Sequence, residues 1–596
     1  MAPAATPPKG GPPRNPETMM LRTYGPLLAL AALPFLAFHL AVLIAGQLSG
    51  HAPNISIGDT IGAILSHPTD PMAGYPASAG PLPNLVLTGF LAFIIFLVLG
   101  ALATVGYVLW TRRRGKDGEA REGTATKAEL VGVLGEAAVH KRAARDRPSL
   151  AGVKDLDFRT AAVYLGRDTQ SNQKLWASHE DSFFVVGPPR SGKTVSLCGP
   201  LMLDAPGALV ASSTKADLLM VGAIPRREVG PVLVFDPEDI SGWPHLLRWS
   251  AVSGCEDPAT AIRRADAMVA AKPMGSGGNT SFFTESAGTV LRCLLHAAAL
   301  GGKNMRDVVR WANDFTDLEP LDILRGSPRA VGAWSEDLRT YTQGANETIA
   351  SLKMTISLVL KSLSNPSVLE KCSPAQGEAF NVEEFITRGG TIFVLNSGGE
   401  GGSTAPLCTA LVDDIVQIGK RMSQSTDSGR LDPPLRIVLD EAATGCPLPG
   451  LPTYMADTGG RGITVCACVQ TFAQARARWG KEEAGQIFGA STTKIVLGGV
   501  PEADDLEQLS RLCGERDLPT TSSSTGPKGE VSYSYSQRRE RVYTPTEIRQ
   551  MPPGQGLLMY RNMPPIMARL EPWMNRSDAE EIKAGMKEAR KMTGRS

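Results

Sequence analysis

Residues 181–194 read DSFFVVGPPRSGKT and join two signals that are specific in combination. The apolar residues 183–186 predict a buried strand, and the next eight residues fit the G-x-x-x-x-G-K-[ST] pattern. In such a loop, backbone N–H groups face phosphate oxygens, the lysine reaches the β- and γ-phosphates, and the threonine hydroxyl ligates Mg²⁺. The pattern therefore predicts a site for ATP and Mg²⁺. The predicted phosphate-binding residues are Gly187, Pro188, Pro189, Arg190, Ser191, Gly192, Lys193 and Thr194.

Two acidic residues end another apolar run. Residues 436–441 read RIVLDE, so Asp440 and Glu441 follow a predicted buried strand. With a phosphate loop upstream, we expect Asp440 to hold Mg²⁺ through water, opposite Thr194. Glu441 is expected to orient and activate the attacking water. Without that loop, the same pair would be read as solvated acids at an ordinary strand end.

Gln470 directly follows the apolar run 463–469. A polar residue at the carboxyl end of a central parallel strand lies at the edge of the sheet that binds ligands. Gln470 is therefore predicted to sense the γ-phosphate. Cys466 and Cys468 lie within the run, and no second cysteine pair or histidine is nearby, so we interpret them as small core residues.

Short apolar runs alternate with helical patterns on both sides of a long helical region. Further strands are predicted at 208–213, 231–235, 391–395, 493–497 and 556–560. This alternation is typical of a parallel sheet with helical crossovers. Residues 256–388, in contrast, carry apolar residues at helical spacing and few strand patterns. The predicted fold class is therefore α/β, a P-loop nucleotide-binding domain with an inserted all-α domain.

Two apolar stretches without Asp, Glu, Lys or Arg precede the phosphate loop, at about 26–46 and 85–110. Each is long enough to cross a hydrocarbon core of about 30 Å. Residues 50–84 contain no Lys or Arg, whereas basic residues precede the first stretch and follow the second. The positive-inside rule therefore predicts two N-terminal transmembrane helices in the cell membrane, with the N-terminus and the ATPase domain cytoplasmic. For the first stretch a cleaved signal peptide is an alternative, which leaves the large domain on the same side.

The charge balance limits how the protein can contact nucleic acid, and the cysteines indicate the compartment in which it lies. The 596 residues include 61 Lys and Arg against 60 Asp and Glu, so no global basic field attracts nucleic acid. Any contact with nucleic acid must then be local, for instance inside a ring pore. All nine cysteines follow the phosphate loop, which suits a reducing cytoplasm.

Composition also suggests how the chain divides. The first residues are rich in Pro, Gly and Ala, residues 161–166 predict a short strand, and residues 519–536 are expected to form a mobile polar loop. The C-terminal tail is expected to be a solvated helix available to a partner.

The predicted segments are a disordered leader 1–24, a membrane anchor 25–110 with an outer loop 50–84, an approach segment 111–180, the nucleotide-binding domain 181–255 and 389–573, the all-α domain 256–388, and the tail 574–596.

Several motifs, in their order along the chain, resemble those of the type IV coupling proteins, the membrane-anchored ATPases of conjugative DNA transfer and type IV secretion. Two predicted spans precede GPPRSGKT, and Pro200 follows in the next helix. STKADLL is similar to the family's Lys-Gly-Glu-Leu-type motif, with Ala216 in place of its glycine and Asp217 in place of its acid. The remaining matches are Phe282-Phe283 through Ala287, VLDEAA, GGRG, Gln470 with TFAQARARWG, and YTPTEIRQMPPGQGLLM. The resemblance covers most of residues 85–573.

The resemblance implies a RecA-like motor that assembles as a homo-hexamer around a channel for single-stranded DNA. Such a coupling protein links a relaxase-bound DNA, the relaxosome, to the channel proteins of a type IV secretion system. In such rings an arginine from one subunit completes the active site of its neighbour, and Arg461 best fits that role. An alternative is that Arg461 is an ordinary turn arginine. Lys215 either stabilises a helix start or binds phosphate nearby.

Two other functions remain open from the sequence. One is a pump for protein secretion or chromosome segregation, although segregation pumps usually carry more spans and a DNA-reading winged-helix end that is not visible here. The other is a membrane scaffold that binds nucleotide only to assemble. The intact pair Asp440 and Glu441 argues against a scaffold, because a protein that only binds nucleotide needs no general base.

Overall fold

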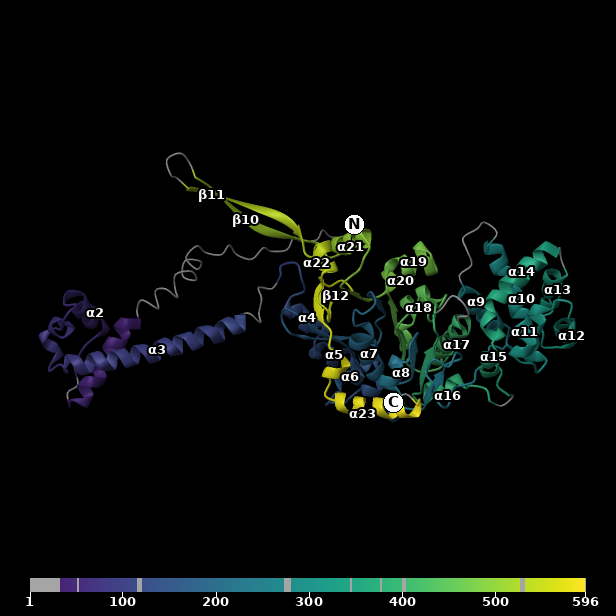
Figure 1. The fold of residues 1–596 in the computed structure, drawn as a ribbon, viewed down its shortest axis with the longest axis horizontal. Coiled ribbons are helices and arrows are strands. Elements are labelled where there is room, and N and C mark those ends of the chain that lie inside the picture. Colours follow the sequence, from purple (N-terminus) through teal and green to yellow (C-terminus); the bar gives the residue numbers. More distant parts are fainter. Residues whose placement is uncertain are drawn as a thin grey trace. The chain divides into compact units, whose positions relative to one another are not determined.

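The computed structural model describes residues 33–50, 53–114, 121–272, 280–343, 346–375, 378–398, 404–525 and 531–594 (Figure 1). The chain divides into two compact units, Met1–Gly118 and Glu119–Ser596.

The first unit is helical in its described part. It contains a helix over Leu33–Leu48, α2 (Ile57–Ser66), two short 3₁₀ turns (Pro71–Gly74 and Ala77–Ala79) and α3 (Leu85–Arg114). Within the described residues, one helix is long and apolar enough to cross a membrane, over Leu85–Leu102.

The two predicted spans have different outcomes. The second one corresponds to α3, where Val86, Phe90 and Phe93 are 80, 63 and 62% exposed. Its length and its exposed apolar surface fit the prediction of a membrane-spanning helix. The first stays a prediction, because residues 26–32 lie outside the described part and the remainder forms a shorter helix.

The segment between these helices is more ordered than its Pro/Gly-rich composition suggests. Ser56 caps α2 in a reciprocal capping box with Asp59. The Thr60 hydroxyl lies 2.8 Å from His39 Nδ1 and accepts a hydrogen bond of 3.0 Å from the Tyr75 hydroxyl. The segment predicted as the outer loop therefore contains a helix, whose polar side chains contact the preceding helix, and its position outside the membrane stays a prediction.

The second unit is built on an eleven-stranded sheet. The strand order is β2-β1-β13-β12-β9-β3-β8-β7-β4-β6-β5. Seven strands, from β9 to β5, are parallel, whereas β12, β13, β1 and β2 continue the sheet antiparallel. Their bounds are β1 (Val163–Asp168), β2 (Lys174–Ala177), β3 (Phe183–Val186), β4 (Leu209–Ser213), β5 (Val232–Phe235), β6 (Thr391–Leu395), β7 (Leu435–Leu439), β8 (Ile463–Val469), β9 (Thr493–Leu497), β12 (Gln555–Tyr560) and β13 (Ile566–Arg569).

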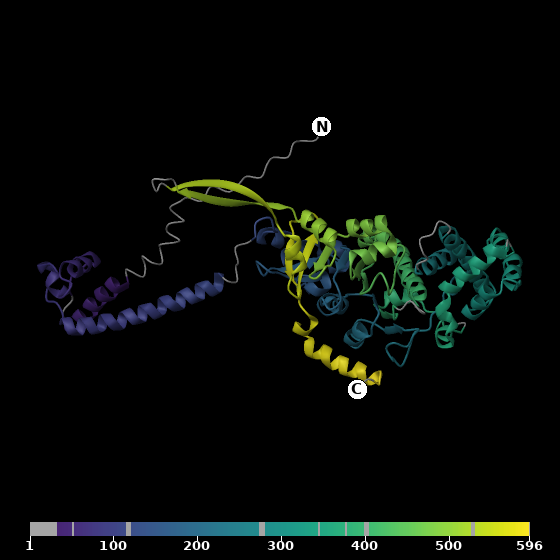
Figure 2. The same cartoon turned by 45° about the horizontal axis from the view of Figure 1, so that its top comes forward.

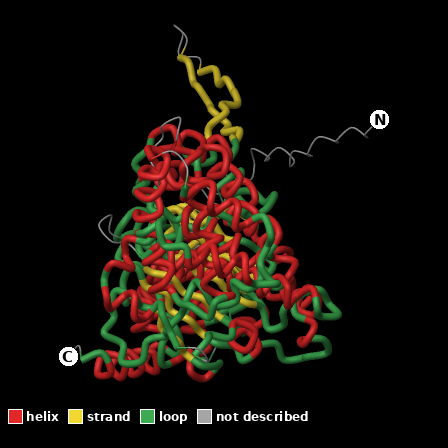
Figure 3. Tube along the Cα trace, turned by 90° about the vertical axis from the view of Figure 1, so that its right-hand side faces the viewer, coloured by secondary structure: helices red, strands yellow, loops and turns green. Residues whose placement is uncertain are grey.

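Helices cover both faces of this sheet (Figure 3). The central strands β3 and β8 are therefore buried along their full length, which explains why they are uninterrupted apolar runs. One face packs against α4 (Lys127–Leu134), α7 (Gly199–Leu203), α8 (Asp217–Gly222) and α23 (Ala579–Met592). The other packs against α9 (Pro258–Ala270), α17 (Ala405–Gln424), α18 (Leu451–Asp457), α19 (Phe472–Trp479), α20 (Lys481–Ala490), α21 (Ala503–Leu512) and α22 (Pro545–Arg549).

The predicted α/β sheet is thus confirmed, but it is mixed rather than purely parallel, because residues 556–560 form the antiparallel strand β12. The all-α insertion is also confirmed: between β5 and β6 the described residues form helices without strands. They are α9, α10 (Thr280–Leu300), α11 (Met305–Asn313), α12 (Glu319–Gly326), α13 (Trp334–Thr342), α14 (Asn346–Val359), α15 (Pro366–Lys371) and α16 (Val382–Thr387).

Residues 519–536 correct a prediction. In place of a mobile polar loop, β10 (Glu515–Thr525) and β11 (Val531–Arg541) pair in antiparallel register from Glu515 opposite Arg541 to Thr525 opposite Val531. This two-stranded ribbon projects from the rest of the second unit (Figure 2). The physical reason is that the threonine and tyrosine residues along these segments favour extended backbone although they are polar.

Two flanking segments also join the domain. The approach segment 111–180 contributes α4, α5 (Glu136–Asp146), α6 (Phe158–Ala161), and the strands β1 and β2. The tail, expected to be solvated, forms α23, whose Ile582 and Ala589 are buried against the sheet's helical layer. Arg576 anchors its start by an ion pair of 2.8 Å to Asp204.

Candidate functional site

The phosphate loop leaves β3 at the carboxyl edge of the parallel strands. It enters one wide π-helical turn, Thr194–Cys198, which continues as α7. Pro200 has no N–H to donate and clashes with the carbonyl four residues earlier, so a regular helix cannot run through this point. The helix that follows the phosphate loop is therefore irregular at its start.

The loop's backbone needs its glycines. A Cβ at Gly187 would lie 2.8 Å from both Leu497 Cδ1 and Ser191 Oγ, so a larger residue would displace these side chains. Gly192 has a φ of +89°, a conformation that side chains disfavour. Arg190 adopts a φ of +64° in spite of its side chain, and such strain costs about 1–3 kcal/mol.

Lys193 is 6% exposed and lies inside the loop. Its ammonium donates a hydrogen bond to the Gly187 carbonyl. A buried ammonium held by the loop's own backbone is already positioned to meet phosphate oxygens. This agrees with the predicted role of Lys193.

Asp440, at the end of β7, collects three donors. It accepts hydrogen bonds from the Thr194 hydroxyl at 3.1 and 3.2 Å, from the Ser213 hydroxyl at 3.3 Å and from the Cys198 thiol at 3.3 Å. Burial raises the pKa of Asp440 to about 6, against the lowering effect of these hydrogen bonds. The structure thus brings Asp440 and Thr194 together, as predicted from the two motifs.

Glu441 and Gln470 meet at the ends of adjacent strands. The Gln470 amide donates a hydrogen bond of 3.0 Å to Glu441 Oε1. The other oxygen, Oε2, is buried and has no hydrogen-bond partner. Burial raises the pKa of Glu441 above its ordinary value, while the Gln470 hydrogen bond and the charge of Lys193 lower it. A buried carboxylate oxygen without a partner is suited to accept a proton from water.

These residues line one cleft of about 500 Å³. Its walls include the phosphate loop from Pro188 onward, Asp440, Glu441 and Gln470, and also Lys215, whose charge lowers the pKa of Glu441. Lys215 therefore faces the site, which favours phosphate binding among the two roles expected for it. Thr194 and Asp440 could hold Mg²⁺ between them. Hard cations prefer oxygen ligands, and the oxygen atoms of these two side chains lie within hydrogen-bond distance of each other.

Sequence reasoning missed Ser213 and Cys198 as partners of Asp440. Ser213 ends β4, and β4 pairs with β7, so strand order alone would have revealed it. Cys198 also lies 3.5 Å, sulfur to sulfur, from Cys468. Cys466 and Cys468 are 1 and 0% exposed, which confirms their prediction as core residues.

Arg461 lies away from this chain's own cleft. It ends the turn Gly459–Arg461 before β8, whereas Gln470 follows the same strand, about 20 Å further along. Arg461 is paired with Asp457 at 3.2 Å, and Asp457 also pairs with Lys420 at 2.9 Å. Arg461 is thus not brought to Lys193 in the single chain, and its role in a neighbouring subunit stays a prediction.

Comparison with known proteins adds two findings. A family described as the TraM recognition site of TraD and TraG matches residues 434–553. Among solved structures, the plasmid coupling protein TrwB in complex with ADP and Mg²⁺ aligns with a TM-score of 0.51 at 20% identity, covering 66% of this chain and 86% of that chain. The unbound monoclinic form of TrwB aligns with a TM-score of 0.50 at 19% identity, covering 66% of this chain and 85% of that chain. No curated protein matches in sequence.

The sheet, the phosphate loop and the acids at its edge define a P-loop nucleotide-binding protein of the α/β class. Its fold is that of the conjugative coupling protein TrwB. The resemblance to type IV coupling proteins is therefore confirmed, in sequence over residues 434–553 and in fold over two thirds of the chain.

Proposed function

We propose that the chain is a membrane-anchored ATPase that recruits single-stranded DNA with its relaxase and pumps it into a type IV secretion channel. The observation that carries the proposal is the convergence of Thr194, Asp440, Glu441 and Gln470 beside the phosphate loop. A protein that only bound nucleotide would not need a buried carboxylate oxygen left free beside a glutamine.

Each residue has a chemical task in the proposed reaction. Lys193 and the loop amides bind the β- and γ-phosphates, and Thr194 with Asp440 holds Mg²⁺. The cation supplies charge that neutralises the phosphate oxygens. Glu441 orients water and accepts its proton through Oε2, which has no other hydrogen-bond partner. Gln470 is hydrogen-bonded to Glu441 and transmits a change in the position of Glu441 to β8. The complexes of TrwB with ADP and Mg²⁺ and with ATP and GTP analogues support these ligands.

The proposed motor works as a homo-hexamer. Arg461 lies at the opposite end of β8 from Gln470, so it can serve only a site other than its own. A neighbouring subunit's cation at the γ-phosphate would stabilise the charge of the transition state. This geometry excludes action of Arg461 at the site of its own subunit, whereas the ion pair with Asp457 is what an ordinary turn arginine would make, so action in trans is tested by mixing variant subunits.

Two further features support the proposed membrane location and the proposed partners. The apolar, exposed surface of α3 suits an inner or cell membrane, with the second unit on the cytoplasmic side. The match to a TraM recognition region supports an interaction with proteins of the relaxosome. Channel proteins of the secretion system complete the proposed set of partners.

ATP turnover in lipid nanodiscs, with and without single-stranded DNA, tests the function. We expect the DNA to increase turnover of the wild-type chain, and Lys193→Ala to show no turnover in either condition. Turnover that no single strand changes would instead favour a protein-only pump. Absence of turnover in the wild-type chain would favour the scaffold.

A further inference from the structure

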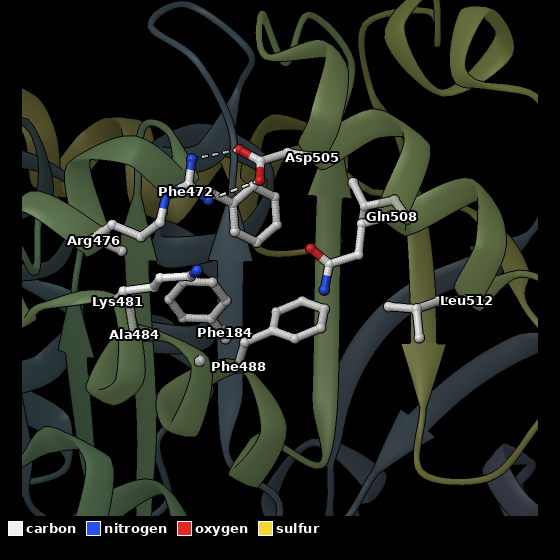
Figure 4. A pocket seen from close by; sticks show the side chains of 12 residues that line it. Phe184, Phe472, Arg476, Lys481, Ala484, Phe488, Asp505, Gln508 and Leu512 are labelled. Atoms are coloured by element: carbon white, nitrogen blue, oxygen red, sulfur yellow. Dashed lines mark hydrogen bonds and ion pairs between the residues drawn. The ribbon is translucent and has the colours of Figure 1, made fainter.

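A small pocket lies on the face of the sheet opposite α7, between α19, α20 and α21 (Figure 4). We call it the aromatic pocket. Its lining residues are Phe184, Phe472, Ala475, Arg476, Lys481, Ala484, Gly485, Phe488, Asp505, Gln508, Leu509 and Leu512. None of these side chains belongs to the nucleotide site.

Three phenyl rings form the inner wall. The ring centres of Phe184, Phe472 and Phe488 lie 6.2, 6.1 and 5.7 Å apart in pairs, in tilted or edge-to-face arrangements. At the mouth, Leu512 is 55% exposed. The cavity volume is about 210 Å³, below the 300–1,000 Å³ typical of pockets for drug-sized ligands. These dimensions suit a single aromatic ring.

Two exposed side chains with hydrogen-bond donors, Lys481 and Gln508, lie at the rim of the same space. Lys481 and Gln508 make no hydrogen bond or ion pair to any described residue, and both point toward the rings in Figure 4. Arg476, by contrast, is neutralised by Asp505 through two hydrogen bonds of 2.8 and 2.9 Å. The pocket therefore offers one positive charge, on Lys481, and one amide, on Gln508, beside its aromatic wall.

The surroundings of the pocket limit how acidic its ligand can be. Glu482, Glu483, Asp504 and Glu507 lie on α20 and α21, outside the lining itself. A run of acidic residues in a ligand would be repelled by them. A ligand with one carboxylate close to its ring avoids that repulsion and still satisfies Lys481.

We propose that the aromatic pocket binds the C-terminal aromatic residue of a partner protein. The ring packs against the wall that the three phenylalanines form, and the terminal carboxylate meets Lys481 and Gln508, because a chain end joins both groups within one residue. The inference deepens the proposed function, on which it rests for the kind of partner: a protein recruited together with the DNA. The pocket's own chemistry, however, is tested without nucleotide or DNA.

Binding is measured by fluorescence polarisation on the full-length chain in lipid nanodiscs. The probe is a fluorescein-labelled octapeptide of glycine and serine that ends in phenylalanine with a free carboxylate. We expect it to bind, and we expect the same peptide with an amidated terminus, or ending in alanine, to bind about tenfold more weakly or worse. Because no ATP is present, a negative result leaves the ATPase test unaffected.

The chain offers a matched pair of variants on α20. A Cβ at Gly485 or at Gly489 meets no atom within 4 Å, and both glycines are exposed, but only Gly485 lines the pocket. Gly485→Leu places a side chain in the pocket and is expected to weaken the probe about tenfold or more, whereas Gly489→Leu is expected to bind it like the wild type. Lys481→Gln is expected to weaken the acid peptide and not the amide.

Three results would overturn the proposal. The first is no binding of the free-acid probe up to about 1 mM, the weakest affinity that still indicates a specific site. The second is equal binding by Gly485→Leu and Gly489→Leu. The third is displacement of the probe by 3-phenylpropionate at the probe's own dissociation constant, which would make the ligand a small aromatic acid rather than a protein terminus.

Discussion

The side-chain amide of Gln470 donates a hydrogen bond of 3.0 Å to Glu441, which joins the ends of the neighbouring strands β8 and β7. One oxygen of the carboxylate is thereby fixed, while the other is buried without a partner. The residue proposed to activate water is therefore held in place by the residue proposed to sense the phosphate. Movement of β8 would change the position of the base directly.

Glu441→Gln is expected to bind ATP and hydrolyse it about 10²–10⁴-fold more slowly, the usual range for loss of a general base. The substituted amide keeps the volume of the side chain but cannot accept a proton. Nucleotide affinity from a fluorescent ATP analogue and turnover from phosphate release measure the two effects separately. Near-normal turnover would mean that another residue is the base.

Gln470→Ala is expected to lower turnover about tenfold or more while ATP affinity stays close to that of the wild type, since its amide touches Glu441 and not the loop. Gln474→Ala, in the first turn of α19, is the control, because its side chain accepts a hydrogen bond from the Gln470 backbone and none from Glu441. If both variants lost activity equally, the effect would come from the start of α19 rather than from the contact with Glu441.

Lys193→Ala is expected to abolish ATP turnover, since it removes the cation that meets the phosphates. Membrane insertion, measured by carbonate extraction, should be unchanged because the loop and α3 belong to different units. Lys174→Ala serves as the control, as its ammonium pairs with Glu136 at 3.0 Å on an exposed surface. Unchanged hydrolysis in Lys193→Ala would remove the loop from the mechanism.

Arg461→Ala and Lys193→Ala are expected to be inactive alone and to regain part of the activity when mixed. In a mixed ring, some sites combine an intact Lys193 with an intact Arg461 from the neighbour. Assembly from mixed subunits followed by phosphate-release assays measures this recovery. Arg388→Ala, which removes an exposed pair with Glu384, should be active alone. Mixtures no more active than their components would exclude action in trans.

Asp413→Asn is expected to change how stability depends on pH. Burial raises the pKa of Asp413 to about 6, although the Tyr454 hydroxyl donates to it. Between about pH 4 and 6 the unfolded chain then binds fewer protons than the folded chain, so the free energy of unfolding falls by about 3 kcal/mol as pH rises. In Asp413→Asn this side chain does not titrate, so this decrease in the free energy of unfolding is absent. Its thermal stability relative to the wild type should therefore be greater at about pH 7.5 than at about pH 4.5, and an equal difference at both would contradict the assignment.

Local patterns allowed much of the nucleotide site to be predicted. The phosphate loop, Asp440, Glu441 and Gln470 each follow an apolar run, and the carboxyl ends of parallel strands share one edge. The all-α insertion was equally visible, because helical spacing is repeated over many turns. In contrast, β13 was missed, since its four residues lie just after Pro564 and Pro565 and are too few to show a period.

The sequence by itself determined the phosphate-loop motif and most of the strands and helices, because these depend on neighbouring residues. Only the tertiary structure decided the strand order, which brings Ser213 and Cys198 to Asp440 and takes Arg461 away from Lys193. It also decided that β1 and β2 extend the sheet, and that Phe184 meets Phe472 and Phe488. The physical reason is that such contacts join segments distant in the chain, and these are selected by burial of apolar surface in the whole domain rather than by local preference.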